Sequence, residues 1–213
     1  TEPDYDAAIA DFTTAISLSP AQSGLYFQRG KVYSIKGDND KAIADFTKAI
    51  KYTPAYGDVY LYRGNAYRDT GQFALALADY TGSIANGTKF KTEAYTNRGM
   101  LRSRNGEHDL AIADYGEAIR LDPGYALPYF MRGMEYFLTG RYALAIADLD
   151  RGLALYPGYS RGQPYFIKAV ACERTGRTHE ALVAYRLYLQ KAPPDSEFIG
   201  EAKKRISVLE AGQ

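Results

Sequence analysis

The chain has 213 residues, and 46% of them are hydrophobic, which is enough to bury a continuous core. Its formal net charge of +1 argues against a nucleic-acid binder held by phosphate contacts. No apolar run approaches the roughly 20 residues that a membrane-spanning helix needs. The single cysteine, Cys172, excludes an internal disulfide and leaves the redox compartment open.

The first predicted element is an amphipathic helix over Tyr5–Leu18. Its apolar stripe consists of Tyr5, Ala8, Ile9, Phe12, Ala15 and Ile16. The pattern is that of the second helix of a hairpin whose first helix is missing. Two interpretations stay open: the helix packs only on the next hairpin, or its apolar face recruits another copy of the chain.

From Ser23 onward the sequence repeats a pair of amphipathic helices. Sliding the sequence against itself aligns glycines inside the first helices at spacings of 34 or 35 residues: Gly30, Gly64, Gly99 and Gly133. A glycine inside a helix costs roughly 1 kcal/mol relative to alanine. Its recurrence therefore predicts that the second helix passes too close for a Cβ, at a Gly–Ala contact.

The pattern of each unit resembles the tetratricopeptide repeat, with an aromatic residue four before the Gly, then Tyr, Gly, Ala, an aromatic and a closing Pro. The first full unit matches at Tyr26, Gly30, Tyr33, Ala42, Phe46 and Pro54. The resemblance covers about 190 residues and implies an all-α, right-handed superhelical solenoid of stacked antiparallel helix hairpins. The predicted parts are an array over residues 1–195 and a C-terminal capping helix over 196–213. Within the array, a half repeat at 1–22 precedes repeats at about 23–56, 57–91, 92–125, 126–159 and 160–195.

Two later segments depart from the repeat pattern. The junction Asn86–Lys89 has one extra residue and lacks the usual Pro, which predicts a loosened loop. Asn86 also opens a formal glycosylation motif, although an Asn-Gly turn explains the same residues. After Pro194, a helix from Ser196 to about Ala211 has one apolar side and a charged back, as a terminal cap requires.

Basic and acidic residues recur beside the core positions. Arg or Lys precedes the small residue of each first helix, at Arg29, Arg63, Arg98, Arg132 and Lys168. Asp recurs in the second helices, at Asp11, Asp45, Asp79, Asp114 and Asp148. Pairing each Asp with the basic residue of the following unit leaves none unmatched. We therefore predict ion pairs between repeats.

The sequence offers no catalytic, metal or cofactor site. His108 and His179 lack neighbouring metal ligands, and Asp38-Asn39-Asp40 lacks the glycine and glutamate of a calcium loop. Cys172 replaces a core Tyr and has no base beside it, so we expect a buried, inert thiol. We predict that the chain is not an enzyme.

The concave face of such an array is the expected binding surface, because one stripe of each first helix remains after the core is sealed. In the last two repeats this stripe is apolar: Leu127, Phe130, Met131, Met134, Phe137, Leu138, Phe166, Ile167 and Val170. In earlier repeats it is polar: Tyr62, Asn65, Arg68, Asn97 and Arg104. We expect a two-zone groove for a peptide or helix, unless the terminal helix covers the apolar part.

The sequence thus predicts a non-enzymatic protein-interaction scaffold that binds a protein or peptide. Self-assembly into a homodimer or larger homo-oligomer, through the incomplete first repeat or the apolar groove, is the alternative. A helical-repeat nucleic-acid binder is a more remote one. Some tetratricopeptide repeat proteins hold a peptide carboxylate with Lys, Asn and Arg, but only Lys31, Asn65 and Asn97 match in part. The sequence names neither the partner nor the compartment.

Overall fold

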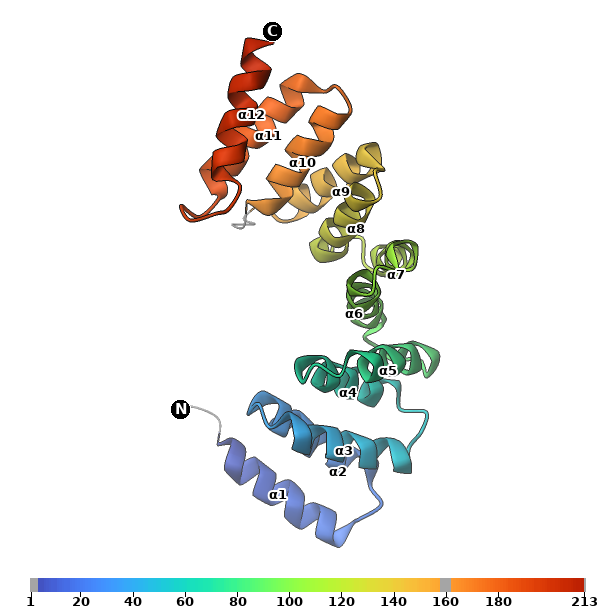
Figure 1. The fold of residues 1–213 in the computed structure, drawn as a ribbon. Helices are drawn as coiled ribbons and strands as arrows, with labels where there is room; N and C mark the ends of the chain where they lie inside the picture. Colours follow the sequence, from blue (N-terminus) through green and yellow to red (C-terminus); the bar gives the residue numbers. More distant parts are fainter. Residues whose placement is uncertain (1–3, 158–161, 213) are drawn as a thin grey trace. The chain divides into compact units, whose positions relative to one another are not determined.

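The structure consists of two-helix hairpins that follow one another along the chain (Figure 1). The computed structural model describes residues 4–157 and 162–212, and within these ranges it contains twelve α-helices and no strand. The helices are α1 (Tyr5–Leu18), α2 (Ser23–Ile35), α3 (Asn39–Tyr52), α4 (Gly57–Asp69), α5 (Phe73–Ala85), α6 (Lys91–Arg104), α7 (His108–Leu121), α8 (Ala126–Leu138), α9 (Tyr142–Leu155), α10 (Gln163–Arg174), α11 (Thr178–Lys191) and α12 (Ile199–Ala211). The predicted all-α fold of stacked hairpins is confirmed.

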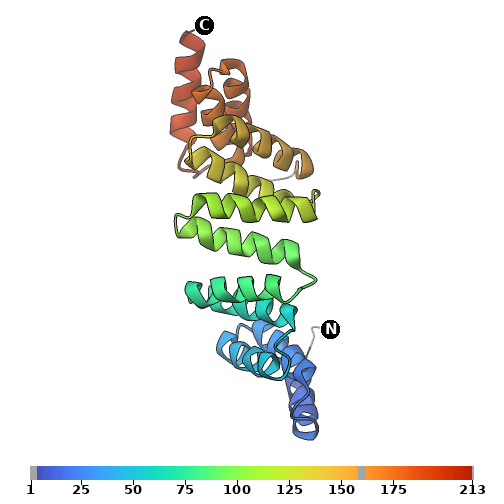
Figure 2. The ribbon, with the colours of Figure 1, turned by 90° about the vertical axis from the view of Figure 1, so that its right-hand side faces the viewer.

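The helices form two compact units, residues 1–101 (unit 1) and 102–213 (unit 2). In unit 1, α2 pairs with α3, α4 pairs with α5, and α1 packs on α2. In unit 2, α8 pairs with α9 and α10 pairs with α11. Helix α7 packs on α8, and α12 packs on α11. Helix α6 contains the boundary between the units in its last turn. Figure 2 shows the antiparallel pairs within each unit from a second side.

Glycines set the geometry of the hairpins. The turn between the two helices contains a glycine with positive φ, for example 81° at Gly37 and 74° at Gly140. Within the first helices, a Cβ at Gly30 would lie 2.6 Å from Cε1 of Phe46, and one at Gly64 would lie 2.9 Å from Tyr80. At these two glycines the obstacle to a Cβ is therefore an aromatic ring of the second helix. The sequence had instead suggested the alanine of that helix.

The predicted ion pairs between repeats are wrong, because the arginines pair within their own hairpins. Arg29 donates two hydrogen bonds of 2.8 Å to Asp45, and Arg63 makes the same bidentate contact with Asp79. In both pairs the side chains face the seam between the two helices of one hairpin. Arg132 and Asp148 repeat this geometry, whereas Asp114 accepts a hydrogen bond from Arg102. The predicted partner of Lys168 is also replaced, by Asp150 at 2.5 Å.

Threonines provide a link between successive repeats that the bidentate Arg29–Asp45 and Arg63–Asp79 pairs do not. The guanidinium of Arg29 also donates to Oγ1 of Thr13 on α1, at 2.9 Å. Arg63 reaches Thr47 of the preceding hairpin in the same way, at 3.1 Å. One arginine therefore closes its own hairpin with two bonds and contacts the preceding second helix with a third.

The junction Asn86–Lys89 is pinned and not loosened. Thr88 is 2% exposed, and its hydroxyl donates to the carboxylate of Asp58 at 2.7 Å. The backbone N–H of Lys89 donates to the same carboxylate oxygen at 3.1 Å. Gly57 admits the loop, because a Cβ there would lie 2.7 Å from the backbone nitrogen of Thr88. A buried aspartate in α4 thus replaces the missing proline as the element that fixes the loop.

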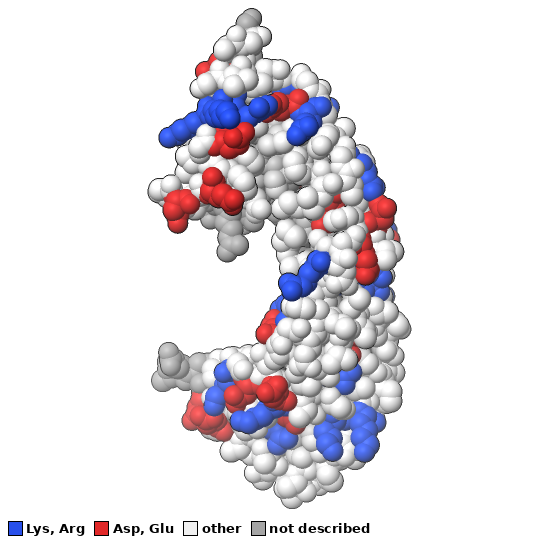
Figure 3. Space-filling view, in the orientation of Figure 1, with Lys and Arg blue, Asp and Glu red and all other residues white. Residues whose placement is uncertain are grey.

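The C-terminal helix α12 packs on α11 through one face. Ala202 is fully buried there, and Ile199, Ile206 and Leu209 pack against the same core cluster as Tyr185. The helix begins at Ile199, three residues later than the sequence predicted, so Phe198 lies just before its first turn. Charged side chains of both signs gather over α12 in the space-filling view (Figure 3).

Candidate functional site

The apolar residues predicted for the binding face lie mainly on α8. Leu138 is 58% exposed, whereas Leu127, Met131, Met134 and Phe137 are half-buried. Most of the surface over this helix is uncharged (Figure 3). In unit 2, therefore, α8 presents apolar side chains that its own core does not fully cover.

Two predicted groove residues belong instead to the core of unit 2. Phe130 is 4% exposed and Ile167 is 8% exposed, and both pack with Leu149 between α8, α9 and α10. Phe130 occupies space left by a glycine of α9, because a Cβ at Gly152 would lie 2.7 Å from its ring. The prediction that these two side chains line an open groove is wrong.

The chain's own C-terminal segment packs with two of the predicted apolar residues of α10, Phe166 and Val170. The ring of Phe166 stacks on that of Phe198, with centroids 4.6 Å apart. Val170 packs in the same cluster and lines a cavity of about 420 Å³ together with Phe166. Arg205 of α12 forms an ion pair with Glu173 of α10 across this cavity. Coverage by the terminal segment, one of the two alternatives, thus applies to α10.

An apolar pocket of about 410 Å³ opens at the start of α8. Its lining residues are Gly124, Tyr125, Ala126, Leu127, Phe130, Leu155 and Tyr156, and none of them is charged. Tyr125 and Tyr156 are 38% and 52% exposed, so their rings lie partly in solvent. The pocket combines two side chains of the predicted stripe, the half-buried Leu127 and the buried Phe130, with the C-terminal end of α9.

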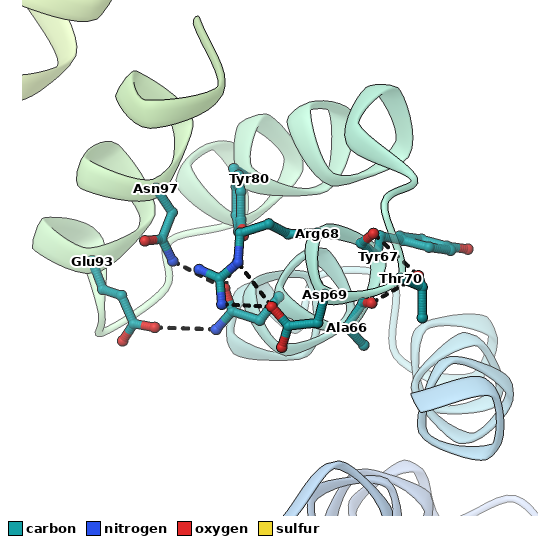
Figure 4. A network of polar contacts seen from close by, with 9 residues as sticks. Ala66, Tyr67, Arg68, Asp69, Thr70, Tyr80, Glu93 and Asn97 are labelled. Atoms are coloured by element: carbon teal, nitrogen blue, oxygen red, sulfur yellow. Dashed lines mark hydrogen bonds and ion pairs between the residues drawn. The ribbon is translucent and has the colours of Figure 1, made fainter. Parts of the chain in front are cut away.

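The polar residues predicted for the binding face form a hydrogen-bond network in unit 1 (Figure 4). Asn65 is its centre: its carbonyl oxygen accepts bonds of 2.9 Å from the hydroxyl of Tyr80 and the amide of Asn97. Its own amide donates to Glu93 at 3.1 Å. The guanidinium of Arg68 lies beside this network and pairs with Asp69. These polar groups are largely satisfied by one another.

The two remaining polar residues lie apart from the centre of this network. The ring of Tyr62 is half-buried and makes edge contacts with Phe27 and Phe90, at centroid distances of 5.2 and 6.1 Å. Arg104 is exposed in the last turn of α6 and belongs to unit 2. Tyr62 therefore contributes mainly a ring face, and Arg104 contributes a solvated charge.

A buried polar cluster in unit 2 was missed by the sequence reasoning. Glu135 on α8 is 2% exposed, and its carboxylate accepts a bond of 2.5 Å from the hydroxyl of Ser103. Nδ1 of His108 lies 2.7 Å from the other carboxylate oxygen, so this histidine contacts a buried acid. The signal was available in the repeat alignment, where Val32, Ala66, Leu101 and Ala171 occupy the position of Glu135.

The cluster does not form a nucleophile and base. Ser103 and His108 each contact the carboxylate and not one another, whereas an activated serine needs the base within hydrogen-bond reach.

Burial raises the pKa of the Cys172 thiol, as expected for an inert buried cysteine. Across residues 4–157 and 162–212, no group of three or more His, Cys, Asp or Glu is arranged to hold a metal ion. No helix in these ranges has the length and apolarity of a membrane span.

Solved structures share this fold. One is YrrB, described as a TPR protein with an unusual peptide-binding site. It is 19% identical in sequence, the match covers 91% of this chain and 97% of that chain, and the TM-score is 0.80. Another is MamA, with 26% identity, 80% of this chain and 91% of that chain, and TM-score 0.71. A third is the C-terminal part of a TPR repeat-containing protein from Cytophaga hutchinsonii. It is 21% identical in sequence, the match covers 98% of this chain and 83% of that chain, and the TM-score is 0.76.

Sequence comparisons point to one family. No curated protein matches the chain significantly. Family models do match: tetratricopeptide repeat at residues 92–125 and at 126–159, and TPR repeat at residues 31–71. Together they span just over half of the chain, and they coincide with the glycine and aromatic pattern of the hairpins. The chain belongs to the tetratricopeptide repeat family.

Proposed function

We propose that this chain is a protein-interaction scaffold whose unit 2 binds a peptide segment of a partner protein along α8. A bulky apolar side chain of the peptide enters the pocket beside Leu127. The observation that carries the proposal is this uncharged pocket of about 410 Å³, whose lining residue Phe130 belongs to the core cluster on which Met131 and Met134 pack. An apolar anchor gains free energy on leaving water, and no charged side chain lines the pocket.

The shape and chemistry of the surface favour a peptide. Met131 and Met134 continue the apolar surface from the pocket toward Leu138. Methionine side chains adapt to irregular partners, and an extended or helical segment can place successive apolar residues along one helix. Tyr125 and Tyr156 flank the entrance with hydroxyl groups that can hydrogen-bond to a peptide backbone.

Unit 1 carries a polar face of its own, which we propose as a second contact surface. Its proposed members are Tyr62, Asn65, Arg68 and Asn97, and the exposed Arg104 remains a separate candidate in unit 2. Because Asn65 and Asn97 are occupied by one another, we assign the direct ligand contact to Arg68, whose side chain is 33% exposed. The guanidinium of Arg68 can donate to a peptide carbonyl or carboxylate.

The comparisons support peptide binding at the level of fold. YrrB, with a TM-score of 0.80 to this chain, is described as having a peptide-binding site. A shared fold does not by itself specify a function. The function of a tetratricopeptide repeat array depends on the side chains that it presents. The residues that we assign to the apolar binding face rest on the geometry of unit 2.

The test is a selection from a displayed random peptide library on the immobilised 213-residue chain, followed by titration of the selected peptides. We expect the peptides to share a bulky apolar residue. A variant with Leu127→Glu and Leu138→Glu should weaken their binding about tenfold or more, because each carboxylate must be desolvated at the contact.

The matched control places the same two charges on second helices. Leu144 and Val183 are 50% and 43% exposed on α9 and α11, so Leu144→Glu with Val183→Glu should leave binding unchanged. Circular dichroism melts show whether both variants are folded. Equal affinity of the two folded variants for the selected peptides contradicts the proposal, as does a selection that gives no saturable binder.

A further inference from the structure

The cavity of about 420 Å³ in unit 2 is formed by α10, α11 and α12. Its uncharged wall consists of Phe166, Val170 and Tyr185, of which the first two are half-buried and the third is 1% exposed. Two arginines and two glutamates complete the lining: Arg174, Arg205, Glu173 and Glu201. The volume lies within the range of about 300–1,000 Å³ that is typical of small-molecule sites. The cavity therefore suits a small ligand that has both an apolar part and charged groups.

One pair of these charges is matched within the chain. Nε of Arg205 donates to the carboxylate of Glu173 at 3.0 Å, and the two side chains form an ion pair. The hydroxyl of Tyr185 donates to the same oxygen of Glu173 at 2.9 Å. The carboxylate of Glu173 is thus held by groups from α11 and α12. This pair belongs to the wall of the cavity and needs no ligand to neutralise it.

The other pair of charges has no partner in the described part of the chain. Arg174 lies in the last turn of α10 and Glu201 lies in the first turn of α12, and both side chains are exposed. Across residues 4–157 and 162–212, neither side chain has an ion pair or a hydrogen bond, so the two do not pair with one another. One cavity therefore presents an unpaired cation from one helix and an unpaired anion from another.

Both unpaired charges lie near the same atom. Burial is the main cause that raises the pKa of Tyr185, and the charge of Glu201 adds to the rise, whereas the charge of Arg174 lowers the pKa. The two charged groups are thus within electrostatic reach of the Tyr185 hydroxyl, which lies between α10 and α12 through its bond to Glu173. This convergence places them around one site.

We propose that this cavity binds a free α-amino acid with an apolar side chain. The guanidinium of Arg174 donates to the carboxylate of the ligand, and the carboxylate of Glu201 accepts from its ammonium group. The side chain of the ligand packs on Phe166 and Val170 and so leaves water. The site is separate from the pocket beside Leu127, and the inference does not depend on peptide binding there.

The charges favour a free amino acid over other small ligands. An amino acid carries an ammonium and a carboxylate group on one carbon atom, so it satisfies Arg174 and Glu201 together. The first residue of a peptide offers only the ammonium group, and the last residue offers only the carboxylate. The four charged residues of the lining sum to zero, so the cavity has no excess of positive charge for a multiply charged anion such as phosphate.

The experiment is isothermal titration calorimetry of the intact 213-residue chain with L-phenylalanine, L-leucine and L-methionine. We expect saturable binding of at least one of them at one site. For the amino acid that binds most tightly, the N-acetyl derivative removes the ammonium charge and the amide removes the carboxylate. Each derivative should bind about tenfold more weakly, because one charged residue of the cavity then lacks a partner.

Variants of the two unpaired residues assign the contacts. Arg174→Gln should weaken binding of the amino acid about tenfold but leave binding of its amide unchanged, since the amide has no carboxylate to lose. Glu201→Gln should weaken binding of the amino acid to a similar extent but leave the N-acetyl derivative unaffected. Both residues are exposed, and circular dichroism verifies that the variants are folded.

Lys204→Gln and Asp195→Asn are the matched controls, because each removes one exposed charge that does not line the cavity. Both should bind the amino acid as the wild type does. Absence of saturable binding of all three amino acids overturns the proposal. Wild-type affinity of the Arg174 or Glu201 variant also overturns it. An N-acetyl derivative or an amide that binds as tightly as the free amino acid overturns it in favour of a peptide C-terminus or N-terminus, respectively.

Discussion

Helices α4 and α8 hold equivalent places in their hairpins, yet they differ in chemistry at the position after the helical glycine. Asn65 in α4 accepts hydrogen bonds from Tyr80 and Asn97 and so ties the second full repeat to its neighbour in unit 1. Met134 in α8 is half-buried and packs against the apolar cluster of Phe130 and Leu149. The same backbone thus permits two uses of one position. A polar residue there stabilises the stack, and an apolar residue leaves surface for a ligand.

The largest effect is expected at a feature that both units share, the half-buried arginine that pairs with an aspartate of its own hairpin. Arg63→Met leaves the carboxylate of Asp79, 7% exposed, without its charge partner, and should cost about 3 kcal/mol of unfolding free energy. Arg132→Met does the same to Asp148 in unit 2. Because Arg63 also bonds to Thr47, we expect its replacement to cost about 1 kcal/mol more. Urea unfolding measures both.

The double variants provide the control for this prediction. Arg63→Met with Asp79→Asn removes both charges, so most of the lost stability should return. If the single arginine variants remain as stable as the wild type, the bidentate pairs do not hold the hairpins together. If the Arg63 and Arg132 variants lose equal stability, the contact with Thr47 adds nothing.

Exchanging the two chemistries tests the comparison directly. Asn65→Met leaves the hydroxyl of Tyr80 and the amide of Asn97 without their acceptor, and should cost about 1–3 kcal/mol while binding of the selected peptides in unit 2 is unchanged. Met134→Asn should change stability by about 1 kcal/mol or less and weaken peptide binding severalfold. Urea unfolding and peptide titration on both variants separate the two roles. A Met134→Asn chain with wild-type affinity removes Met134 from the binding face.

Much of the fold followed from periodicity, because a helical hairpin of fixed length repeats its core positions at fixed spacing. The glycine and aromatic series predicted the hairpins and their turns. The ion pairs did not follow, since pairing Asp45 with Arg29 or with Arg63 fits the same periodic series. Only the direction of the side chains, toward the seam within a hairpin, distinguishes these partners.

The binding face was harder to predict, because a first helix packs on two neighbours and little of its surface is left over. Phe130 was placed on the open stripe, but its equivalents Phe27 and Leu61 are 6% and 1% exposed. Comparing equivalent positions across repeats would have assigned it to the core. The same comparison would have found Glu135, an acidic residue at an otherwise apolar position.

The smallest effect at neutral pH concerns buried tyrosines, one in each unit. Burial raises the pKa of Tyr185 in unit 2 to about 12, and it raises the pKa of Tyr80 in unit 1 as well. A tyrosine of the unfolded chain titrates near pH 10, roughly. The folded chain therefore holds these protons more tightly, so their contribution to stability is complete below about pH 10 and declines as the pH rises through the folded pKa.

The two hydroxyl groups should respond differently to removal. Tyr185→Phe should flatten the alkaline decline by at most about 1.4 kcal/mol per pH unit and change little at pH 7, because its hydroxyl bonds to the partly exposed Glu173. Tyr80→Phe should flatten the decline but also lose stability at pH 7, because Asn65 loses a donor within the network. Urea unfolding between pH 7 and pH 11, roughly the window set by these titrations, distinguishes the variants. A wild-type curve that stays level above roughly pH 10 would contradict this prediction. It would mean that both tyrosines ionise as readily in the folded chain as in the unfolded chain, and that burial protects neither unit's tyrosine from water.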